Sequence, residues 1–191
     1  AKEIYRILAE ELPKELEKEA RAEEERALKK EKEEKKKKSL QELKAKNEAI
    51  MHQELVSKAM AGAAEEQTKL GKIYEYGQGV EKNQKSAVKW YMKAADQGNA
   101  EALNKLGEAY SDPFSWTDIP QSDELALKWF KRAAQKGNAE AMYNLGQMHS
   151  DNAFRGCGTV GVNKEEAFEW FKKAAVLGHA DAQNHVGVHY A

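Results

Sequence analysis

Three segments of equal length carry almost the same sequence: AVKWYMKAADQGNAEALNKLG at residues 87–107, ALKWFKRAAQKGNAEAMYNLG at 126–146 and AFEWFKKAAVLGHADAQNHVG at 167–187. In each segment a glycine comes eight positions after the tryptophan. The glycine of the closing Leu-Gly or Val-Gly pair comes nine positions later. Self-similarity at a fixed spacing is the signature of a repeat architecture. The second part of the chain is therefore an internal repeat.

The length of the repeat varies at one place only. A further pair, Leu70-Gly71, precedes the first segment, and successive Leu-Gly glycines are 36, 39 and 41 positions apart. The variation lies between this glycine and the next tryptophan, a distance of 19, 22 and 24 positions. A half-copy ending at Gly62 lies nine positions before Gly71. It predicts that the end of the N-terminal helix packs as the second helix of an incomplete repeat.

Each unit has the pattern of two helices. Apolar residues fall three and four positions apart, as a buried helical stripe requires. Gly98 suits the left-handed position after a helix, and Asn99 suits the cap of the next one. We therefore expect an all-α fold with about three and a half helix pairs over residues 58–191. Because the tryptophans recur at one repeat position, we also expect Trp90, Trp129 and Trp170 in the core.

These motifs resemble the Sel-one-like repeat family, the longer-period relatives of tetratricopeptide repeats. The first copy carries Leu70-Gly71-x-x-Tyr74-x-x-Gly77-x-Gly79-Val80, followed by Ala87-x-x-Trp90-Tyr91-x-x-Ala94-Ala95-x-x-Gly98. The second copy lacks the glycine turn, and the third keeps only Gly161-Val162 of it after an insertion. The resemblance implies an α-solenoid that binds proteins or peptides and assembles complexes. It does not imply catalysis.

The resemblance also implies a binding surface. In tetratricopeptide-like stacks the first helix of each pair lines the concave face, at fixed offsets from the Leu-Gly glycine. Those offsets correspond to Thr68, Lys72, Glu75 and Tyr76, then Asn104, Glu108, Ser111 and Asp112, then Tyr143, Gln147, Ser150 and Asp151. The last two offsets stay open in the second and third copies, where the connections are longer. This polar, mildly acidic set suits an extended basic or polar peptide, with tyrosines as amphipathic contacts.

The connection of the second repeat contains two aromatic residues with no repeat counterpart. Phe114 and Trp116 lie between prolines, where no core position calls for them. Two roles are open for this pair: binding a partner, or packing over the edge of the solenoid.

Residues 1–57 form a charged arm. Glu, Lys, Arg and Ala dominate, and opposite charges recur four apart with Glu first, as in Glu31 and Lys35. Such pairs each stabilise an isolated helix by about 0.2–0.5 kcal/mol. Ser39 with Glu42 has capping-box spacing, so the arm is one helix or two. The arm is a charged spacer, a disordered tail or a docking arm. Its favoured anchor is an apolar face formed by Ile4, Tyr5, Ile7, Leu8 and Leu12.

Composition excludes several classes of protein. The 191 residues carry 31 basic and 32 acidic side chains, a formal net charge of −1, which argues against a dedicated nucleic-acid binder. No apolar run reaches the ~18–20 residues of a membrane span, and no secretory signal is visible. The chain begins at Ala1 without Met, so processing could hide a targeting segment. The compartment stays open, with the cytoplasm favoured.

Few residues suggest chemistry. His185 and His189 have a spacing that can bind zinc, but no convincing third ligand accompanies them. Cys157 is the single cysteine, near Arg155 in a glycine-rich loop. An acidic residue recurs six positions before each Leu-Gly glycine, where it favours the helix dipole or faces a ligand: Glu65, Glu101, Glu140 and Asp181.

The sequence thus predicts a protein–protein interaction scaffold or adaptor, with no catalytic residue, cofactor or metal site. Its partner is a protein or peptide within a larger complex, on which the arm can dock. The alternative is a structural strut whose charged helix is a spacer. The enzyme alternative is a hydrolase that uses the thiol or the histidine pair.

Overall fold

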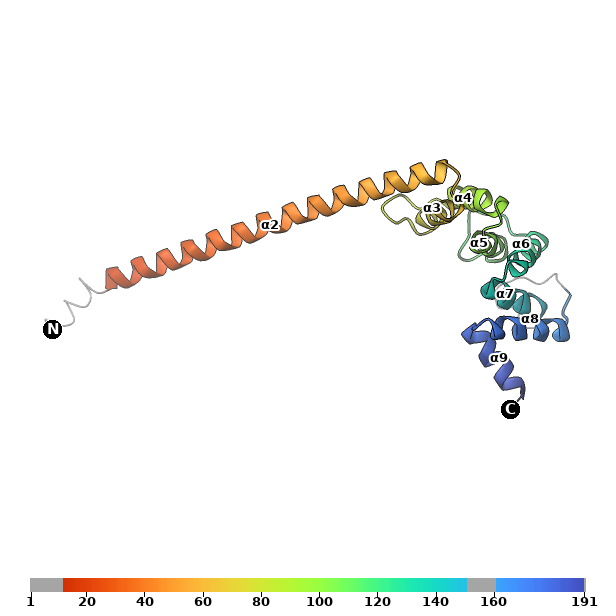
Figure 1. Ribbon diagram of the computed structural model, residues 1–191. Coiled ribbons are helices and arrows are strands. Elements are labelled where there is room, and N and C mark those ends of the chain that lie inside the picture. The colour runs from red at the N-terminus through yellow and green to blue at the C-terminus, as the bar shows by residue number, and fades with distance from the viewer. Residues whose placement is uncertain (1–11, 151–160, 191) are drawn as a thin grey trace. The chain divides into compact units, whose positions relative to one another are not determined.

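The structure, a computed structural model, describes residues 12–150 and 161–190, and all regular structure in these ranges is helical (Figure 1). The helices are α2 (Leu12–Met60), α3 (Ala64–Tyr76), α4 (Gln84–Asp96), α5 (Ala100–Ser111), α6 (Asp123–Gln135), α7 (Ala139–His149), α8 (Lys164–Val176) and α9 (Ala180–Tyr190). None of them, within these ranges, is long and apolar enough to cross a bilayer. The predicted all-α class is confirmed.

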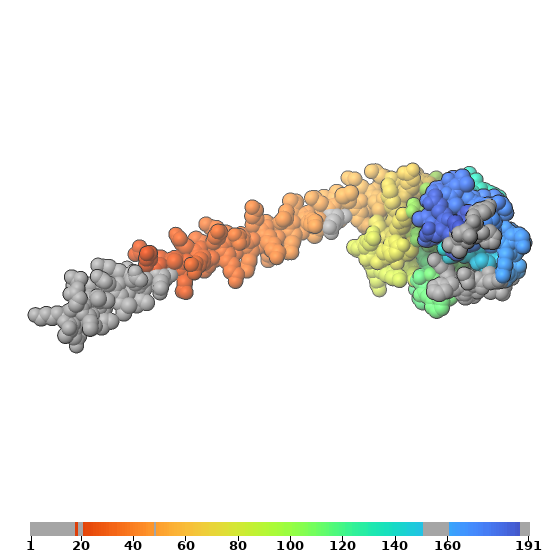
Figure 2. Space-filling model, turned by 90° about the horizontal axis from the view of Figure 1, so that it is seen from below, coloured from red at the N-terminus to blue at the C-terminus, as the bar shows by residue number. Residues whose placement is uncertain are grey.

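The chain divides into two structural units, Ala1–Gln53 and Glu54–Ala191. The first is dominated by α2, one continuous helix of 49 residues, and the described side chains between residues 21 and 51 are all exposed (Figure 2). The alternative of two helices is wrong for this segment. The Ser39 hydroxyl donates to the carbonyl oxygen of Lys36 at 2.9 Å, so Ser39 bonds back into the helix and caps no new one. Glu31 and Lys35 form the expected ion pair, at 2.5 Å.

The second unit is a stack of helix pairs. We call α3, α5, α7 and α9 the first helices, and α4, α6 and α8 the second helices (Figure 1). Each second helix packs on the first helix before it and on the first helix after it. Two first helices, α5 and α7, also contact each other directly. We call the side of the stack that the first helices form the inner face.

The Leu-Gly glycines allow the closest packing within each pair. A Cβ added to Gly71 would lie 2.5 Å from the ring of Tyr91. A Cβ added to Gly107 would lie 2.4 Å from Phe130, and one on Gly146 would lie 2.5 Å from Phe171. Real Cβ atoms essentially never come so close to another atom. Because each of these glycines has no side chain, it leaves room for an aromatic ring of the second helix.

The tryptophans lie at the edge of the core, so the expectation that they belong to the core is only partly right. Trp129 and Trp170 are partly buried against the core, while the aromatic residue that follows each of them is buried. Consecutive helical residues point about 100° apart, so the two rings cannot face the interior equally. The outer faces of the tryptophans carry cations instead. Lys93, Arg132 and Lys173 lie 4.2, 4.8 and 4.2 Å from the ring centroids of Trp90, Trp129 and Trp170.

The turn from each second helix to the next first helix has the same backbone conformation in three places. Glycines with φ of 80°, 82° and 88° follow the second helices at positions 98, 137 and 178. Asn99 and Asn138 then cap α5 and α7 by accepting from the third backbone N–H along. His179 does the same for α9 through Nδ1, at 3.2 Å. Three repeats therefore share one rigid corner, as their invariant spacing predicts.

The variable connection is closed by one recurring backbone bond, which we call the clamp. The capping residue of each second helix donates its N–H to a carbonyl in the last turn of the preceding first helix. These bonds are Asn83 to Tyr74 at 2.8 Å, Ser122 to Tyr110 at 3.0 Å and Asn163 to His149 at 2.9 Å. Because the accepting residue is always the third after the Leu-Gly glycine, every length difference lies between the two ends of the clamp.

The end of α2 contacts the first repeat at Ala59, and its packing as a half-repeat stays a prediction. Ala59 is fully buried, and its carbonyl accepts from the Gln67 side-chain amide at 3.0 Å. Gly62, with φ of 100°, makes the turn into α3.

Candidate protein-binding surface

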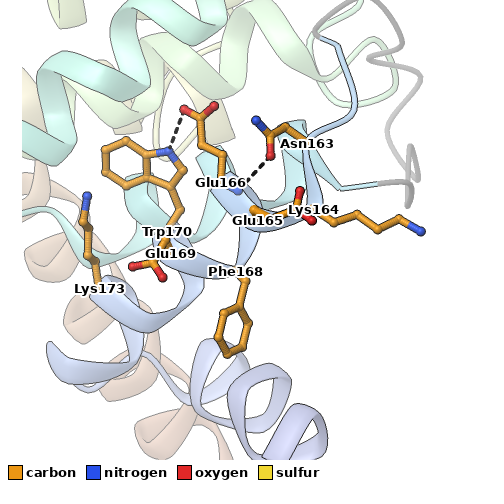
Figure 3. A pocket seen from close by; sticks show the side chains of 8 residues that line it. All are labelled: Asn163, Lys164, Glu165, Glu166, Phe168, Glu169, Trp170 and Lys173. Atoms are coloured by element: carbon orange, nitrogen blue, oxygen red, sulfur yellow. Dashed lines mark hydrogen bonds between the residues drawn. The ribbon is translucent and has the colours of Figure 1, made fainter.

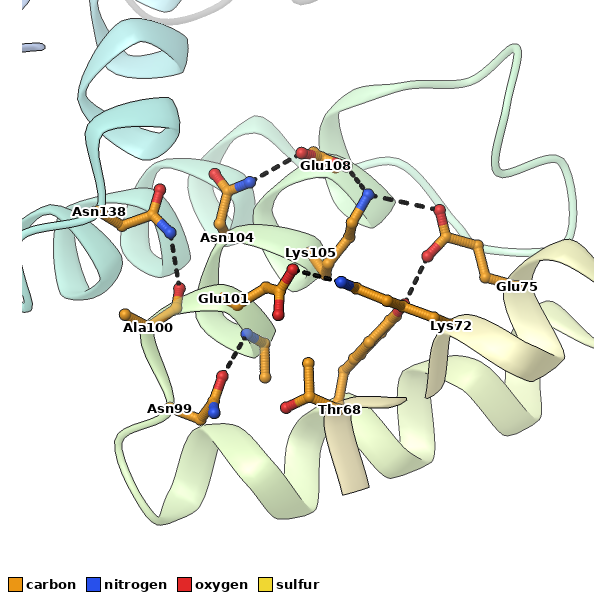
Figure 4. Close-up of polar contacts among 12 residues, drawn as sticks. Thr68, Lys72, Glu75, Asn99, Ala100, Glu101, Asn104, Lys105, Glu108 and Asn138 are labelled. Carbon is orange, nitrogen blue, oxygen red and sulfur yellow. Dashed lines mark hydrogen bonds and ion pairs between the residues drawn. The ribbon is translucent and has the colours of Figure 1, made fainter. Parts of the chain in front are cut away.

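The inner face of the first two repeats carries a network of ion pairs (Figure 4). Lys72 of α3 pairs with Glu101 of α5 at 2.5 Å. Lys105 lies between two carboxylates, Glu108 at 2.8 Å and Glu75 at 3.5 Å. The network therefore joins α3 to α5.

The carboxylates of this network raise the pKa of the lysine and the tyrosine that they contact. Burial lowers the pKa of Lys105, but the carboxylates of Glu108 and Glu75 outweigh it and the net pKa is raised. Burial, and then the hydrogen bond to Glu75, raises the pKa of Tyr91. The Tyr91 hydroxyl donates to Glu75 at 2.5 Å. At neutral pH the lysine is thus a cation and the tyrosine a neutral donor.

Two residues that the sequence assigns to the binding face are used inside the solenoid. Thr68 is 1% exposed, and its hydroxyl donates to the Ala64 carbonyl at 2.9 Å. Asn104 is 4% exposed, donates to Glu108 at 2.7 Å and accepts from Asn144 at 3.2 Å. Their polar atoms hold neighbouring turns and repeats together. The sequence predicted that Thr68 and Asn104 contact a partner directly, but their burial contradicts this. Both residues support the inner face from below.

Most of the other described residues of the predicted set are half-buried or exposed. Tyr76 is 58% exposed at the end of α3, and Lys72 and Gln147 are half-buried. Glu108 is held by its two partners, and Ser111 is buried. Asp151 lies outside the described residues. The accessible part of the inner face is thus smaller than the sequence pattern suggests.

The third repeat replaces ion pairs by aromatic stacking. Tyr143 of α7 stacks on the ring of His179, with centroids 4.4 Å apart and planes at 18°. The Nδ1 atom of His179 accepts the N–H of Ala182, so its Nε2 carries the proton that it donates to Glu140 at 3.0 Å. His185 stacks on Phe171 at 4.7 Å. Tyr143 is therefore a junction between α7 and α9 and presents only part of its ring to solvent.

The connection of the second repeat separates its two aromatic residues. Trp116 is 3% exposed and meets the buried ring of Tyr91 edge-on, at 6.4 Å. Gln84 holds this loop by donating to the Ser115 carbonyl at 2.6 Å and accepting from the Asp118 N–H at 2.9 Å. Trp116 is therefore a packing residue, and its burial contradicts the alternative that it contacts a partner directly. Phe114 is 78% exposed, so partner contact through Phe114 stays a prediction.

A shallow pocket lies along one side of α8 (Figure 3). Asn163 caps the helix there by accepting from the Glu166 N–H at 3.0 Å, and Glu166 accepts from Trp170 Nε1 at 3.4 Å. All the residues that line it belong to α8 or its cap. A wall made of one helix encloses no small molecule, so this is a surface hollow beside the tryptophan.

Residues for metal or thiol chemistry are not brought together in the described part. Within residues 12–150 and 161–190, no three His, Cys, Asp or Glu residues form a group that could hold a metal. Cys157 lies outside the described residues, as does the side chain of His189. Two acidic residues of the repeated first-turn position have partners: Glu101 pairs with Lys72, and Glu140 pairs with His179.

Sequence reasoning missed the residues that organise the inner face. Lys105 and Asn144 share one repeat position, two before the Leu-Gly glycine, yet one is a charged centre and the other an amide link. Because their chemistry differs, no repeated pattern marks them. His179 could have been found, since it stands where two repeats have asparagine caps.

Comparisons with known proteins agree with this architecture. Sel1 repeats are matched at residues 67–99, 100–138 and 139–179, more than half of the chain. A Sel1 repeat protein from Oxalobacter formigenes is 30% identical, with a TM-score of 0.58 over 71% of this chain and 96% of that one. A protective antigen of uropathogenic Escherichia coli with an SLR fold is 28% identical, with a TM-score of 0.65 over 74% of this chain and 29% of that one.

A curated relative is much longer than this chain. The chitin synthase regulator SKT5 of Saccharomyces cerevisiae is 43% identical over 63 residues, which are 33% of this chain and 9% of that protein. Sel1 repeats generally mediate protein–protein interaction and are typically non-enzymatic modules. By its repeats and its fold, the chain belongs to the Sel1 repeat family.

Proposed function

We propose that this chain is an interaction scaffold whose inner face binds an extended, basic or polar segment of a partner protein. The observation that carries the proposal is a division of charge between the two helix layers. The first helices α3, α5 and α7 contain six acidic and three basic residues. The second helices α4, α6 and α8 contain six acidic and nine basic residues.

Because of this division, the first helices favour a positively charged partner and the second helices favour a negatively charged one. Complementary charge increases the rate of encounter and excludes partners of the wrong sign. The inner layer would attract a cationic segment, and the outer layer would repel it. Tyr76 and the half-buried Gln147 supply an amphipathic ring and an amide that can bond to an extended backbone. The pre-formed network at Lys105 lowers the entropy lost when a partner binds.

The direct test uses a pool of unstructured peptides of mixed charge, measured by fluorescence polarisation against the whole chain. We expect the tightest binders to be basic. The double change Tyr76→Ala and Gln147→Ala should weaken them at least tenfold, about 1.4 kcal/mol. Lys131→Ala, on the exposed face of α6, is the matched control and should leave binding unchanged. Asn104→Ala is a poor probe, because it would strip Glu108 and Asn144 of a bond.

Two results would refute the inner-face proposal. Selection of acidic peptides would show that the charge division does not guide binding. Affinity that survives the double change but is lost on Phe114→Ala would move the site to the loop edge.

The strut alternative has one observation in its favour, the unbroken α2. A helix of 49 residues is about 74 Å long at 1.5 Å per residue. If the arm only spaces two bodies, deletion of residues 1–38 should abolish assembly and leave peptide binding intact. If the inner face carries the function, the same deletion should leave the partner bound.

A further inference from the structure

The exposed length of α2 carries one cluster of large apolar side chains. Leu40, Leu43, Ile50 and Met51 are 64%, 55%, 55% and 71% exposed, and they all lie between positions 40 and 51. From residue 21 to residue 39 the same exposed helix carries a single leucine, Leu28. Clustered large apolar side chains in solvent mark an interaction site, whereas a single one is ordinary. This part of the arm is therefore a candidate contact surface.

The cluster has the spacing of a coiled-coil seam. Positions 40, 43, 47 and 50 are alternately three and four residues apart, which is the a and d series of a heptad. Leu40, Leu43, Asn47 and Ile50 occupy these positions on one side of α2, and we call these four residues the seam. The next positions of the series on either side are charged or polar: Glu33 and Lys36 before the seam, Glu54 and Ser57 after it. The seam is thus limited to two heptads.

Asn47 distinguishes between the alternative occupants of the seam. It is exposed at the centre of an otherwise apolar stripe, where an apolar partner would leave its amide without a hydrogen bond. In a parallel pair of copies in register, position 47 faces position 47, and the two amides can bond to each other. In an antiparallel pair whose apolar residues overlap, position 47 faces position 43, so Asn47 meets Leu43 instead. The asparagine therefore favours a second copy in parallel orientation.

The residues beside the seam allow this pairing. In a parallel dimer each g side chain lies near the e side chain of the next heptad of the other copy. Here those pairs are Ser39 with Lys44 and Lys46 with Met51, and neither brings two like charges together. The aliphatic stem of Lys46 can also cover Met51, the one apolar residue of the cluster outside the seam.

We propose that α2 pairs with α2 of a second copy through the seam, as a short parallel coiled coil in which Asn47 bonds to Asn47. The helix is already formed over 49 residues, so pairing need not also supply the free energy of helix formation. Four layers make an interface below the about 800 Å² per partner of a stable complex, so the dimer is weak. The dimer adds to the proposed function without depending on it, because two joined inner faces can bind a partner with repeated segments more tightly.

The test is sedimentation velocity of the full chain at about 10 µM and about 0.5 mM, a range that suits a weak dimer. We expect a monomer at the lower concentration and a dimer, with no larger species, at the higher one. Leu43→Lys places an unpaired charge in the seam and should raise the dissociation constant at least tenfold. Leu28→Lys is the matched control, because it makes the same change on a similarly exposed leucine of α2 outside the seam. It should leave the dissociation constant unchanged.

A charge exchange at position 47 tests the orientation. Asn47→Lys and Asn47→Asp each place like charges opposite one another in a parallel dimer, so each variant alone should stay monomeric at about 0.5 mM. In an equimolar mixture the introduced lysine of one copy faces the introduced aspartate of the other, and dimers should return. An antiparallel pair would gain nothing from mixing, because position 47 faces Leu43 there. Circular dichroism of each variant checks that α2 is still helical.

Several results would overturn the proposal. The first is a parent chain that is monomeric at both concentrations, and the second is association that Leu43→Lys leaves unchanged. An equal loss in Leu28→Lys would show that charge along the whole arm, and not the seam, controls association. A charge-exchange mixture that stays monomeric would exclude the parallel pairing of Asn47 with Asn47.

Discussion

The contact between the Leu-Gly glycines and the aromatic rings can be tested by adding one methyl group. In Gly107→Ala the new Cβ would lie 2.4 Å from two ring carbons of Phe130, about 1 Å closer than ordinary contact. The ring is 1% exposed and has no free space to enter. Overpacking of this kind costs about 1–3 kcal/mol, and alanine returns up to about 1 kcal/mol of helix propensity. We expect a net loss of about 1–2 kcal/mol in the free energy of unfolding.

Gly187→Ala is the matched control, because it makes the same change where the added Cβ meets nothing within 4 Å. It should stabilise α9 by up to about 1 kcal/mol. The two variants should thus differ by about 2–3 kcal/mol, more than either differs from the parent chain.

Urea unfolding followed by tryptophan fluorescence measures both variants. All four tryptophans lie in the unit that begins at Glu54, so the arm does not contribute to the signal. A second change, Phe130→Leu, should relieve part of the loss in Gly107→Ala, which a double-mutant cycle would detect. If Gly107→Ala proves as stable as Gly187→Ala, the ring does not fill the space above the glycine and the packing argument fails.

Three further predictions follow from the contacts described. Trp116→Ala should lower the free energy of unfolding by about 3–5 kcal/mol and Phe114→Ala by less than about 0.5, and equal losses in urea would contradict the burial of one and the exposure of the other. Gln84→Ala should cost about 1–3 kcal/mol in the same assay, since it removes the two hydrogen bonds, each worth about 0.5–1.5 kcal/mol, by which the buried Gln84 holds the loop at Ser115 and Asp118. A peptide of residues 14–38 should be partly helical by circular dichroism and lose helicity as salt screens its Glu–Lys pairs; a random coil at low salt would show that the arm needs a partner to fold.

The repeat register could be predicted from the sequence because it depends on spacing alone. The glycine that ends each second helix and the asparagine that caps the next first helix are fixed by local backbone geometry. Neither needs knowledge of the neighbouring repeat. The structure therefore places the predicted corners at Gly98 and Gly137 with the expected positive φ.

The accessibility of individual side chains could not be predicted in the same way. The Asn104 side chain either points into solvent or bonds to Asn144, and the rotation of one repeat relative to the next decides between them. Successive residues of a helix point about 100° apart, so a small error in this rotation changes which side chains are exposed. Ser39 failed as a helix start for a related reason. A capping pattern competes with the helix on both sides of it, and here the flanking residues are strong helix formers.

The clamp at each variable connection decides how this solenoid can change. The clamped residues are nine, twelve and fourteen positions apart in the three repeats. Chain-closure entropy rises only as the logarithm of length, so the longest loop costs about 0.4 kcal/mol more than the shortest. New sequence can therefore accumulate at this edge, repeat by repeat, while the stack beneath keeps its geometry. In evolution and in protein engineering alike, this edge is where a foreign peptide, such as an epitope or a recognition loop, can be inserted at little thermodynamic cost.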